Sequence, residues 1–130
     1  MNLHLTTLDG RFAVCRLAAD AEAPAWATGA LVSVTRTPEE LSVICSEHLV
    51  PEAATAERGW RCLKVGGPLS FELTGVLAAL TRPLADAGVP VFALSTYETD
   101  YLLVKEEQLT AAASALERAG HALEHPPDNG

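Results

Sequence analysis

A chain of 130 residues with 48% hydrophobic and 20% charged residues has enough apolar side chains for a buried core, which excludes an intrinsically disordered protein. The net charge is −8 and no basic stripe is present, so binding to nucleic acid or to an anionic membrane surface is unfavourable. No apolar run is long enough to cross a bilayer, and the N-terminus lacks a signal-peptide pattern. We therefore expect a cytoplasmic protein.

The first half of the chain predicts short strands. Leu3–Leu8 and Phe12–Leu17 flank Asp9-Gly10, a dipeptide that favours a two-residue turn, so we expect these strands to form a hairpin. The next elements are expected to be a single helical turn, two strands and a polar connector, at Pro24–Ala27, Ala30–Thr35, Leu41–Ser46 and residues 47–58.

A glycine turn and an amphipathic helix follow the strand Arg61–Val65. Gly66-Gly67-Pro68 forms the turn, and the helix is expected to open at Ser70 and to run over 71–87. Its apolar positions repeat with helical spacing and predict one buried face, made of Leu73, Val76, Leu77, Leu80 and Leu84. Pro83 lies inside this pattern and predicts a kink, because proline has no N–H to donate.

The last third of the chain predicts a hairpin and a second helix. The expected strands are Val91–Ser95 and Tyr101–Lys105, with a turn at Tyr97–Asp100 between them. The helix is expected over about 107–119, with Gly120 as its cap. His121–Glu124 predicts a short edge strand.

Neither metal binding nor catalysis is indicated. Cys15, Cys45 and Cys62 lie on strand-like segments without Cys-x-x-Cys spacing, so we expect buried, reduced thiols. The four histidines lack the spacing of metal ligands. Ser46, Glu47 and His48 are neighbours on one short segment, where side chains rarely converge into a catalytic triad. We expect a protein without a metal, a cofactor or an enzymatic activity.

An internal repeat links the two halves. Residues 33–49 align without a gap with residues 93–109, at an offset of 60, and both stretches predict strand, turn, strand and helix. We interpret the chain as two copies of a βαββαβ plan, the first with a reduced helix around Trp26.

The C-terminal half resembles the ACT domain. The residues that carry the resemblance are KVGGPL at 64–69, Phe71, Thr74-Gly75, STYETDY at 95–101 and LVKEE at 103–107. They are similar to the variant found in small bacterial proteins with two ACT-like units and in the cytosolic arginine sensors of animals.

The resemblance implies an α+β fold of tandem ferredoxin-like βαββαβ units, with antiparallel sheets and helices packed on one face. The expected domains are a degenerate ACT-like unit at 1–59, an ACT domain at 60–124 and a flexible tail at 125–130. It also implies a regulatory protein that binds a small molecule, most simply a free amino acid, where two ACT units meet. A ligand-independent module that docks on an enzyme or on another ACT protein is the alternative.

Two segments form the candidate ligand site. A glycine turn before a helix exposes backbone N–H groups that suit a carboxylate, and the polar hairpin offers acceptors for an ammonium group. The expected ligand-binding residues are Gly66, Gly67, Pro68, Leu69, Ser70, Phe71, Ser95, Thr96, Tyr97, Glu98, Thr99 and Asp100. Ordinary turn chemistry is the alternative role of the hairpin residues. Trp26 and Trp60 are interpreted as core residues, and a homodimer is expected to complete the site.

Overall fold

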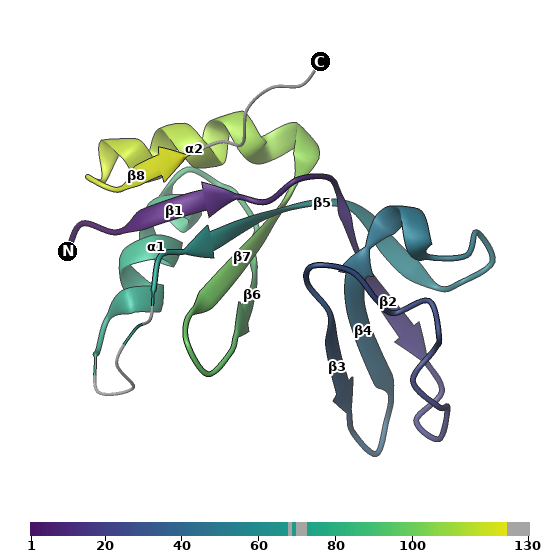
Figure 1. Cartoon of the computed structure of the whole chain (residues 1–130). Coiled ribbons are helices and arrows are strands. Elements are labelled where there is room, and N and C mark those ends of the chain that lie inside the picture. Colours follow the sequence, from purple (N-terminus) through teal and green to yellow (C-terminus); the bar gives the residue numbers. More distant parts are fainter. Residues whose placement is uncertain (68, 70–72, 125–130) are drawn as a thin grey trace. The chain divides into compact units, whose positions relative to one another are not determined.

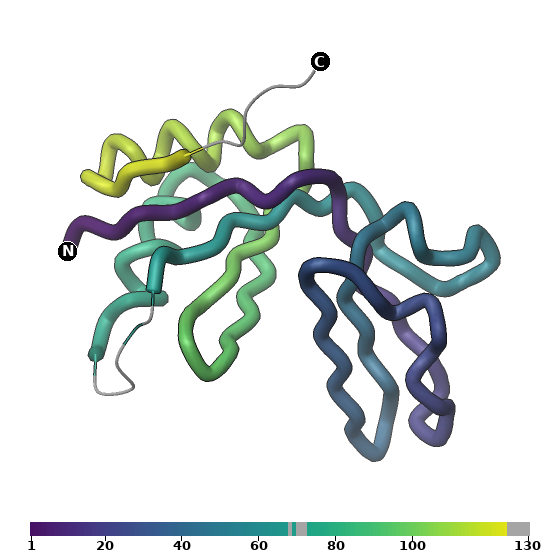
Figure 2. The backbone as a smooth tube through the Cα atoms, viewed as in Figure 1, coloured from purple at the N-terminus to yellow at the C-terminus, as the bar shows by residue number. Residues whose placement is uncertain are grey.

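The computed structural model describes residues 1–67, 69 and 73–124 and has an α+β fold (Figures 1 and 2). The chain divides into two compact units. The C-terminal unit consists of Met1–Asp9 together with Arg61–Gly130, and the N-terminal unit consists of Gly10–Trp60. The first nine residues thus belong with the C-terminal unit, whereas the sequence interpretation placed them in a domain at 1–59.

The C-terminal unit follows the βαββαβ plan with one additional strand. Its elements are β1 (His4–Thr7), the second half of β5 (Ala56–Val65), α1 (Val76–Asp86), β6 (Phe92–Ser95), β7 (Asp100–Lys105), the 3₁₀ helix η2 (Glu106–Gln108), α2 (Leu109–Arg118) and β8 (Ala122–Glu124). The two α-helices pack against one face of the sheet. Leu80 and Leu84 of α1 and Leu116 of α2 share a buried core with Leu5 and Leu63.

The additional strand is β1, which lies between β5 and β8. Leu5 is paired with Val65 in antiparallel register and with Leu123 in parallel register. The expected hairpin at Asp9-Gly10 is therefore wrong, because β1 pairs with β5 and β8, and β2 (Phe12–Leu17) pairs with β4 (Leu41–Ser46) and β5. Tertiary pairing with β5 outweighs the local turn preference, and this pairing is what joins the first nine residues to the C-terminal unit.

The N-terminal unit contains strands but no α-helix between residues 10 and 60. Its elements are β2, β3 (Ser33–Arg36), β4 (Leu41–Ser46), the 3₁₀ helix η1 (Glu47–Leu49) and the first half of β5. β5 begins at Ala56, within the segment that was predicted to be a connector. Trp26 packs against the core of this unit, as expected, and Pro24–Ala27 forms a single turn closed by the Ala27 N–H and the Pro24 carbonyl.

The internal repeat is present, at an offset of 59 rather than 60. Thr37 and Glu40 close the β3–β4 turn with the same three hydrogen bonds, one between backbone groups and two that involve the threonine hydroxyl, with which Thr96 and Thr99 close the β6–β7 turn. The 3₁₀ helices Glu47–Leu49 and Glu106–Gln108 share this offset. The sequence alignment was shifted by one residue, because neighbouring positions of β4 and of β7 are both apolar and match nearly as well at either offset.

All three cysteines are buried and free, as the sequence predicted. Burial raises the pKa of the Cys15 and Cys45 thiols, and it raises the pKa of Cys62 from 9.0 to about 12. Neither α-helix in the described part of the chain has the length and apolar character that crossing a membrane requires.

The Cys62 thiol makes stability depend on pH in alkaline solution. Between pH 9 and about 12 the unfolded chain ionises this thiol while the folded chain keeps it protonated, so the free energy of unfolding falls as pH rises. Between about pH 8 and about pH 10, the wild type should lose about 1.4 kcal/mol more than Cys62→Ala, as measured by urea unfolding. Equal losses in the two proteins would contradict the effect of burial on this thiol.

Candidate functional site

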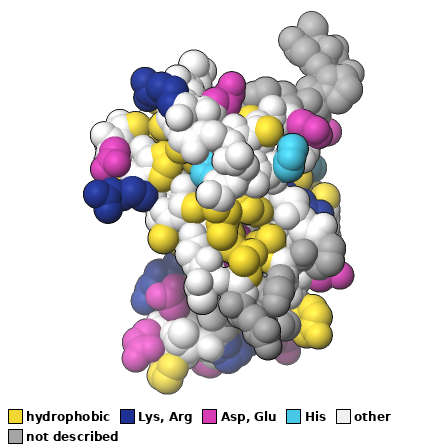
Figure 3. Space-filling model, turned by 90° about the vertical axis from the view of Figure 1, so that its left-hand side faces the viewer, with side chains coloured by type: hydrophobic (Ala, Val, Ile, Leu, Met, Phe, Trp, Pro, Cys, Tyr) yellow, Lys and Arg dark blue, Asp and Glu magenta, His cyan; other side chains and the backbone are white. Residues whose placement is uncertain are grey.

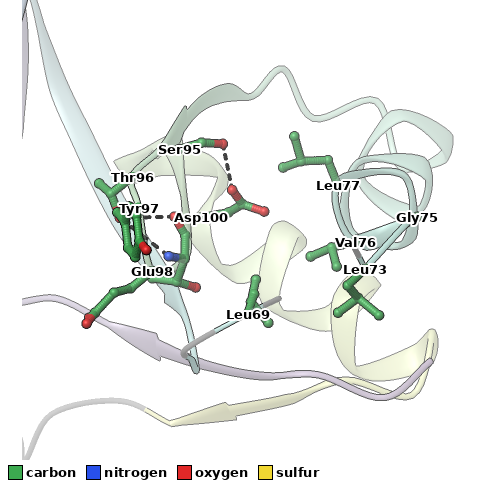
Figure 4. Close-up of a pocket in the computed structure, with 11 residues that line it drawn as sticks. Leu69, Leu73, Gly75, Val76, Leu77, Ser95, Thr96, Tyr97, Glu98 and Asp100 are labelled. Carbon is green, nitrogen blue, oxygen red and sulfur yellow. Dashed lines mark hydrogen bonds between the residues drawn. The ribbon is translucent and has the colours of Figure 1, made fainter. Parts of the chain in front are cut away.

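A cavity of about 330 Å³ lies in the C-terminal unit between the β6–β7 hairpin and the start of α1 (Figure 4). Its lining contains the whole turn of the hairpin and the apolar residues that precede and begin the helix. The lining residues are Leu69, Leu73, Gly75, Val76, Leu77, Ser95, Thr96, Tyr97, Glu98, Thr99 and Asp100.

The cavity includes much of the predicted site. All six predicted residues of the hairpin line it, and so does Leu69. Gly66 and Gly67 are not among the lining residues, and Pro68, Ser70 and Phe71 lie outside the described residues. The two segments that the sequence proposed separately do lie together in the fold.

Hydrogen bonds connect the residues on either side of Gly66-Gly67, here called the glycine segment, to the β6–β7 hairpin. The Leu69 N–H donates to the Glu98 carbonyl at 2.6 Å, and the Thr99 hydroxyl donates to the Val65 carbonyl at 2.6 Å. A Cβ atom on Gly67 would lie 3.1 Å from the Glu98 carbonyl oxygen and 3.1 Å from Thr99 Cβ. Gly67 therefore permits this close approach, and the Leu69 N–H, which was expected to bind a ligand, already has a partner within the chain.

Asp100 is the acidic residue of the cavity that faces α1. Its Oδ1 accepts a hydrogen bond of 2.6 Å from the Ser95 hydroxyl, across the last residue pair before the turn of the hairpin. Figure 4 shows the Asp100 carboxylate on the side that faces α1, whereas the side chain of Glu98 points away from the helix. Of the two acids that were predicted to hold an ammonium group, Asp100 is thus the one directed into the cavity.

The start of α1 forms the opposite wall. The helix begins at Val76, after Gly75 with a φ of 81°, so residues 73–75, which the sequence placed inside the helix, precede it. The predicted start at Ser70 lies outside the described residues. A positive φ ends the preceding segment and aligns the first helical turn, whose N–H groups have no partners within the helix. Among the residues that the structure describes, no side chain caps this terminus, and its first turn contains no acidic residue. Val76 and Leu77, the first two residues of this turn, line the cavity.

The apolar wall was not recognised from the sequence. Leu73 and Leu77 were predicted to belong to the buried helix face, but their exposed fractions are 45% and 37%. Figure 3 shows hydrophobic side chains gathered at the surface on the side of the molecule where α1 lies. The signal was present, since an apolar stripe of five positions is wider than the buried face of Val76, Leu80 and Leu84 requires.

The described residues contain no metal site beside the cavity. No group of three or more histidine, cysteine or acidic side chains in that part of the chain is arranged to hold a metal ion. His121 is buried and makes hydrogen bonds to the backbone with both ring nitrogens, to Leu3 and to Ala79. The cavity is therefore lined by the acidic residues Glu98 and Asp100, of which Asp100 faces α1, by hydroxyl-bearing and apolar side chains and by the first residues of α1.

Known proteins share parts of this sequence. A family model described as an ACT domain matches residues 55–118, and a second model, which describes an N-terminal domain, matches residues 10–53. The cytosolic arginine sensor for mTORC1 subunit 1 of Bos taurus is 32% identical over 97 residues, which cover 66% of this chain and 30% of the sensor. The human protein of that name is 34% identical over 65 residues, 49% of this chain and 20% of that protein. This chain thus spans less than a third of the length of these relatives.

Solved structures share the fold. A crystal structure of an Agrobacterium tumefaciens protein matches with a TM-score of 0.93 and 36% identity, covering 100% of this chain and 98% of that one. The regulatory subunit of aspartate kinase from Thermus thermophilus matches with a TM-score of 0.61 and 12% identity, over 88% of this chain and 95% of that subunit. The latter likeness concerns the fold alone. The match to residues 55–118 shows that this part of the chain belongs to the ACT domain family.

Proposed function

We propose that this chain is a non-catalytic regulatory protein that binds a free amino acid in the cavity between the β6–β7 hairpin and α1. The observation that carries the proposal is the placement of the Ser95–Asp100 pair opposite a helix N-terminus that no side chain in the described part of the chain caps. A carboxylate at one end of a small cavity and backbone N–H groups at the other match the two charges of an α-amino acid.

Each end of the cavity has a defined role in this proposal. Asp100 accepts hydrogen bonds from the ligand's ammonium group, and the first-turn N–H groups of α1 donate to its carboxylate. These N–H donors replace the ones that the sequence placed at Gly67–Phe71. Leu69, Leu73 and Leu77 contact the ligand's aliphatic carbons. The relatives named as arginine sensors and the ACT family membership support an amino acid as the ligand.

Regulation requires that the ligand bind one arrangement of the protein more tightly than another. We propose that a homodimer provides these arrangements in the cytosol. Among the described strands β6 pairs with β7, and we propose that its other edge pairs with a second copy. The strand carries no charged residue that would oppose such pairing.

A thermal-shift screen of the purified protein against the twenty common amino acids tests the proposal. A ligand at one hundred times its Kd adds about 2.7 kcal/mol to the free energy of unfolding, which is visible as a raised melting temperature. We expect selective stabilisation by one amino acid or by a closely related group. A flat screen at millimolar concentrations would remove free amino acids from consideration for this chain.

The alternative is an interaction module that needs no ligand. Apolar side chains exposed beside the cavity favour it, above all Tyr97 with an exposed fraction of 81%, together with Leu73 and Leu77. In that case a partner protein would bind equally well with and without amino acids. The stability screen and a pull-down in dialysed buffer therefore separate the two functions.

A further inference from the structure

Each unit of the chain contains its own copy of one hairpin, and the two copies differ at the residue pair next to the turn. In the C-terminal unit the last pair before the turn is Ser95 and Asp100. The corresponding pair of the N-terminal unit, 59 positions earlier, is Arg36 and Leu41. Leu41 is completely buried in the core of its unit. The hydroxyl and the carboxylate of the cavity are thus replaced by a guanidinium group and an alkyl side chain.

Arg36 uses its guanidinium group within its own unit. One terminal nitrogen donates to the Ala19 carbonyl, and the other donates to the Ala21 carbonyl at 2.7 Å. Both carbonyls belong to the segment that follows the first strand of the unit, where the C-terminal unit has its glycine segment and α1. Two carbonyl oxygens from one short segment suit the planar fork of an arginine, which donates two hydrogen bonds side by side.

The segment that follows β2 also contributes apolar side chains to the core of the N-terminal unit. Ala21, Trp26 and Ala27 pack against the core that contains Leu41 and Cys45. Two tight turns shape the segment, closed by hydrogen bonds from Ala21 to Ala18 and from Ala27 to Pro24. Where the C-terminal unit has a helix start and a cavity, the N-terminal unit therefore has a packed loop and an arginine.

We propose that the Arg36 side chain takes, in the N-terminal unit, the place that the ligand's cationic group takes in the C-terminal unit. The location of that ligand group rests on the proposed function, whereas the contacts of Arg36 do not. The chain then has one ligand site, next to Asp100, and its own exposed Arg36 side chain where a second site would be. The carbonyls of Ala19 and Ala21 form a guanidinium acceptor that the chain fills by itself.

Hydrogen–deuterium exchange of the full chain, read on peptides that cover residues 18–32, tests this role. Removing the guanidinium in Arg36→Ala should accelerate exchange in this segment about fivefold, because charged hydrogen bonds to two carbonyls are lost. Arg36→Lys keeps the charge but not the fork, and should give an intermediate rate. Arg82→Ala is the matched control, since the Arg82 side chain is 81% exposed and pairs with Asp86 on the same helix.

Free guanidinium then tests the acceptor site itself. Millimolar guanidinium chloride should restore protection of residues 18–32 in Arg36→Ala, whereas sodium chloride at equal ionic strength should not, and the wild type should respond to neither. Unchanged exchange in Arg36→Ala, or equal effects of the two salts, would overturn the proposal. If Arg36→Ala loses protection throughout residues 10–60, the Arg36→Lys variant decides. Faster exchange confined to residues 18–32 in Arg36→Lys supports the role, and unchanged exchange in these residues refutes it. Since no amino acid is used, this result is independent of the ligand screen.

Discussion

Asp100→Asn is expected to weaken binding of the amino acid about 30-fold, with little change in the stability of the free protein. The substitution keeps the shape of the side chain and an oxygen that accepts the hydrogen bond from Ser95. It removes the negative charge that faces the ligand's ammonium group, and a hydrogen bond to a charged group is worth about 2 kcal/mol. Titration calorimetry with the amino acid found in the screen measures the change in Kd directly.

Asp86→Asn is the matched control for this experiment. Asp86 is also an aspartate of the C-terminal unit, but it is exposed and pairs with Arg82 one helical turn earlier. We expect its Kd to equal that of the wild type. If Asp100→Asn binds as tightly as the control, the ammonium group is held elsewhere and the proposed orientation of the ligand is wrong.

His121→Phe is expected to lower the free energy of unfolding by about 3 kcal/mol, measured by urea unfolding. The Nδ1 atom of this buried ring accepts the Leu3 N–H at 3.1 Å, so Nε2 carries the proton and donates to the Ala79 carbonyl at 3.0 Å. That carbonyl depends on the ring, because Pro83, four residues later in α1, has no N–H. Phenylalanine fills the space but leaves both backbone groups without these partners.

A second substitution identifies the cause of this loss. Pro83→Ala supplies the missing N–H to the Ala79 carbonyl, so it should stabilise His121→Phe by about 1 kcal/mol more than it stabilises the wild type. His48→Phe serves as the control, because His48 is exposed and should tolerate the change. Equal gains from Pro83→Ala in both backgrounds would show that the ring and the proline are not coupled.

The bounds of several elements could be predicted from the local sequence pattern. In these elements the side chains that the pattern predicts to be buried are the ones that pack in the core. β4 has the predicted bounds, and β7 begins one residue before the prediction. Their central residues are buried in both units, so the apolar runs in the sequence locate them. Gly120, with a φ of 98°, follows the end of α2 near the position that the sequence indicated.

The candidate site likewise contains a part that the sequence predicted and a part that it did not. The polar hairpin could be recognised because turn residues act locally, and all six of its predicted residues line the cavity. The apolar wall could not, since Leu73 and Leu77 have the same hydrophobicity and spacing as the buried leucines of α1. Which of these leucines are covered depends on where β5 and α2 lie, and helical periodicity alone does not contain that information.

The sequence by itself thus determined the fold class, through the order of the predicted elements and the resemblance to the ACT domain. It also determined the duplicated hairpin and the polar turn of the candidate site, because these depend on contacts between residues close together in the chain. Only the tertiary structure decided the insertion of β1 between β5 and β8, the start of α1 at Val76 and the contacts of Arg36. These depend on hydrogen bonds between distant segments, where pairing with β5 or with a loop carbonyl outweighs the local preference of a turn or a helix.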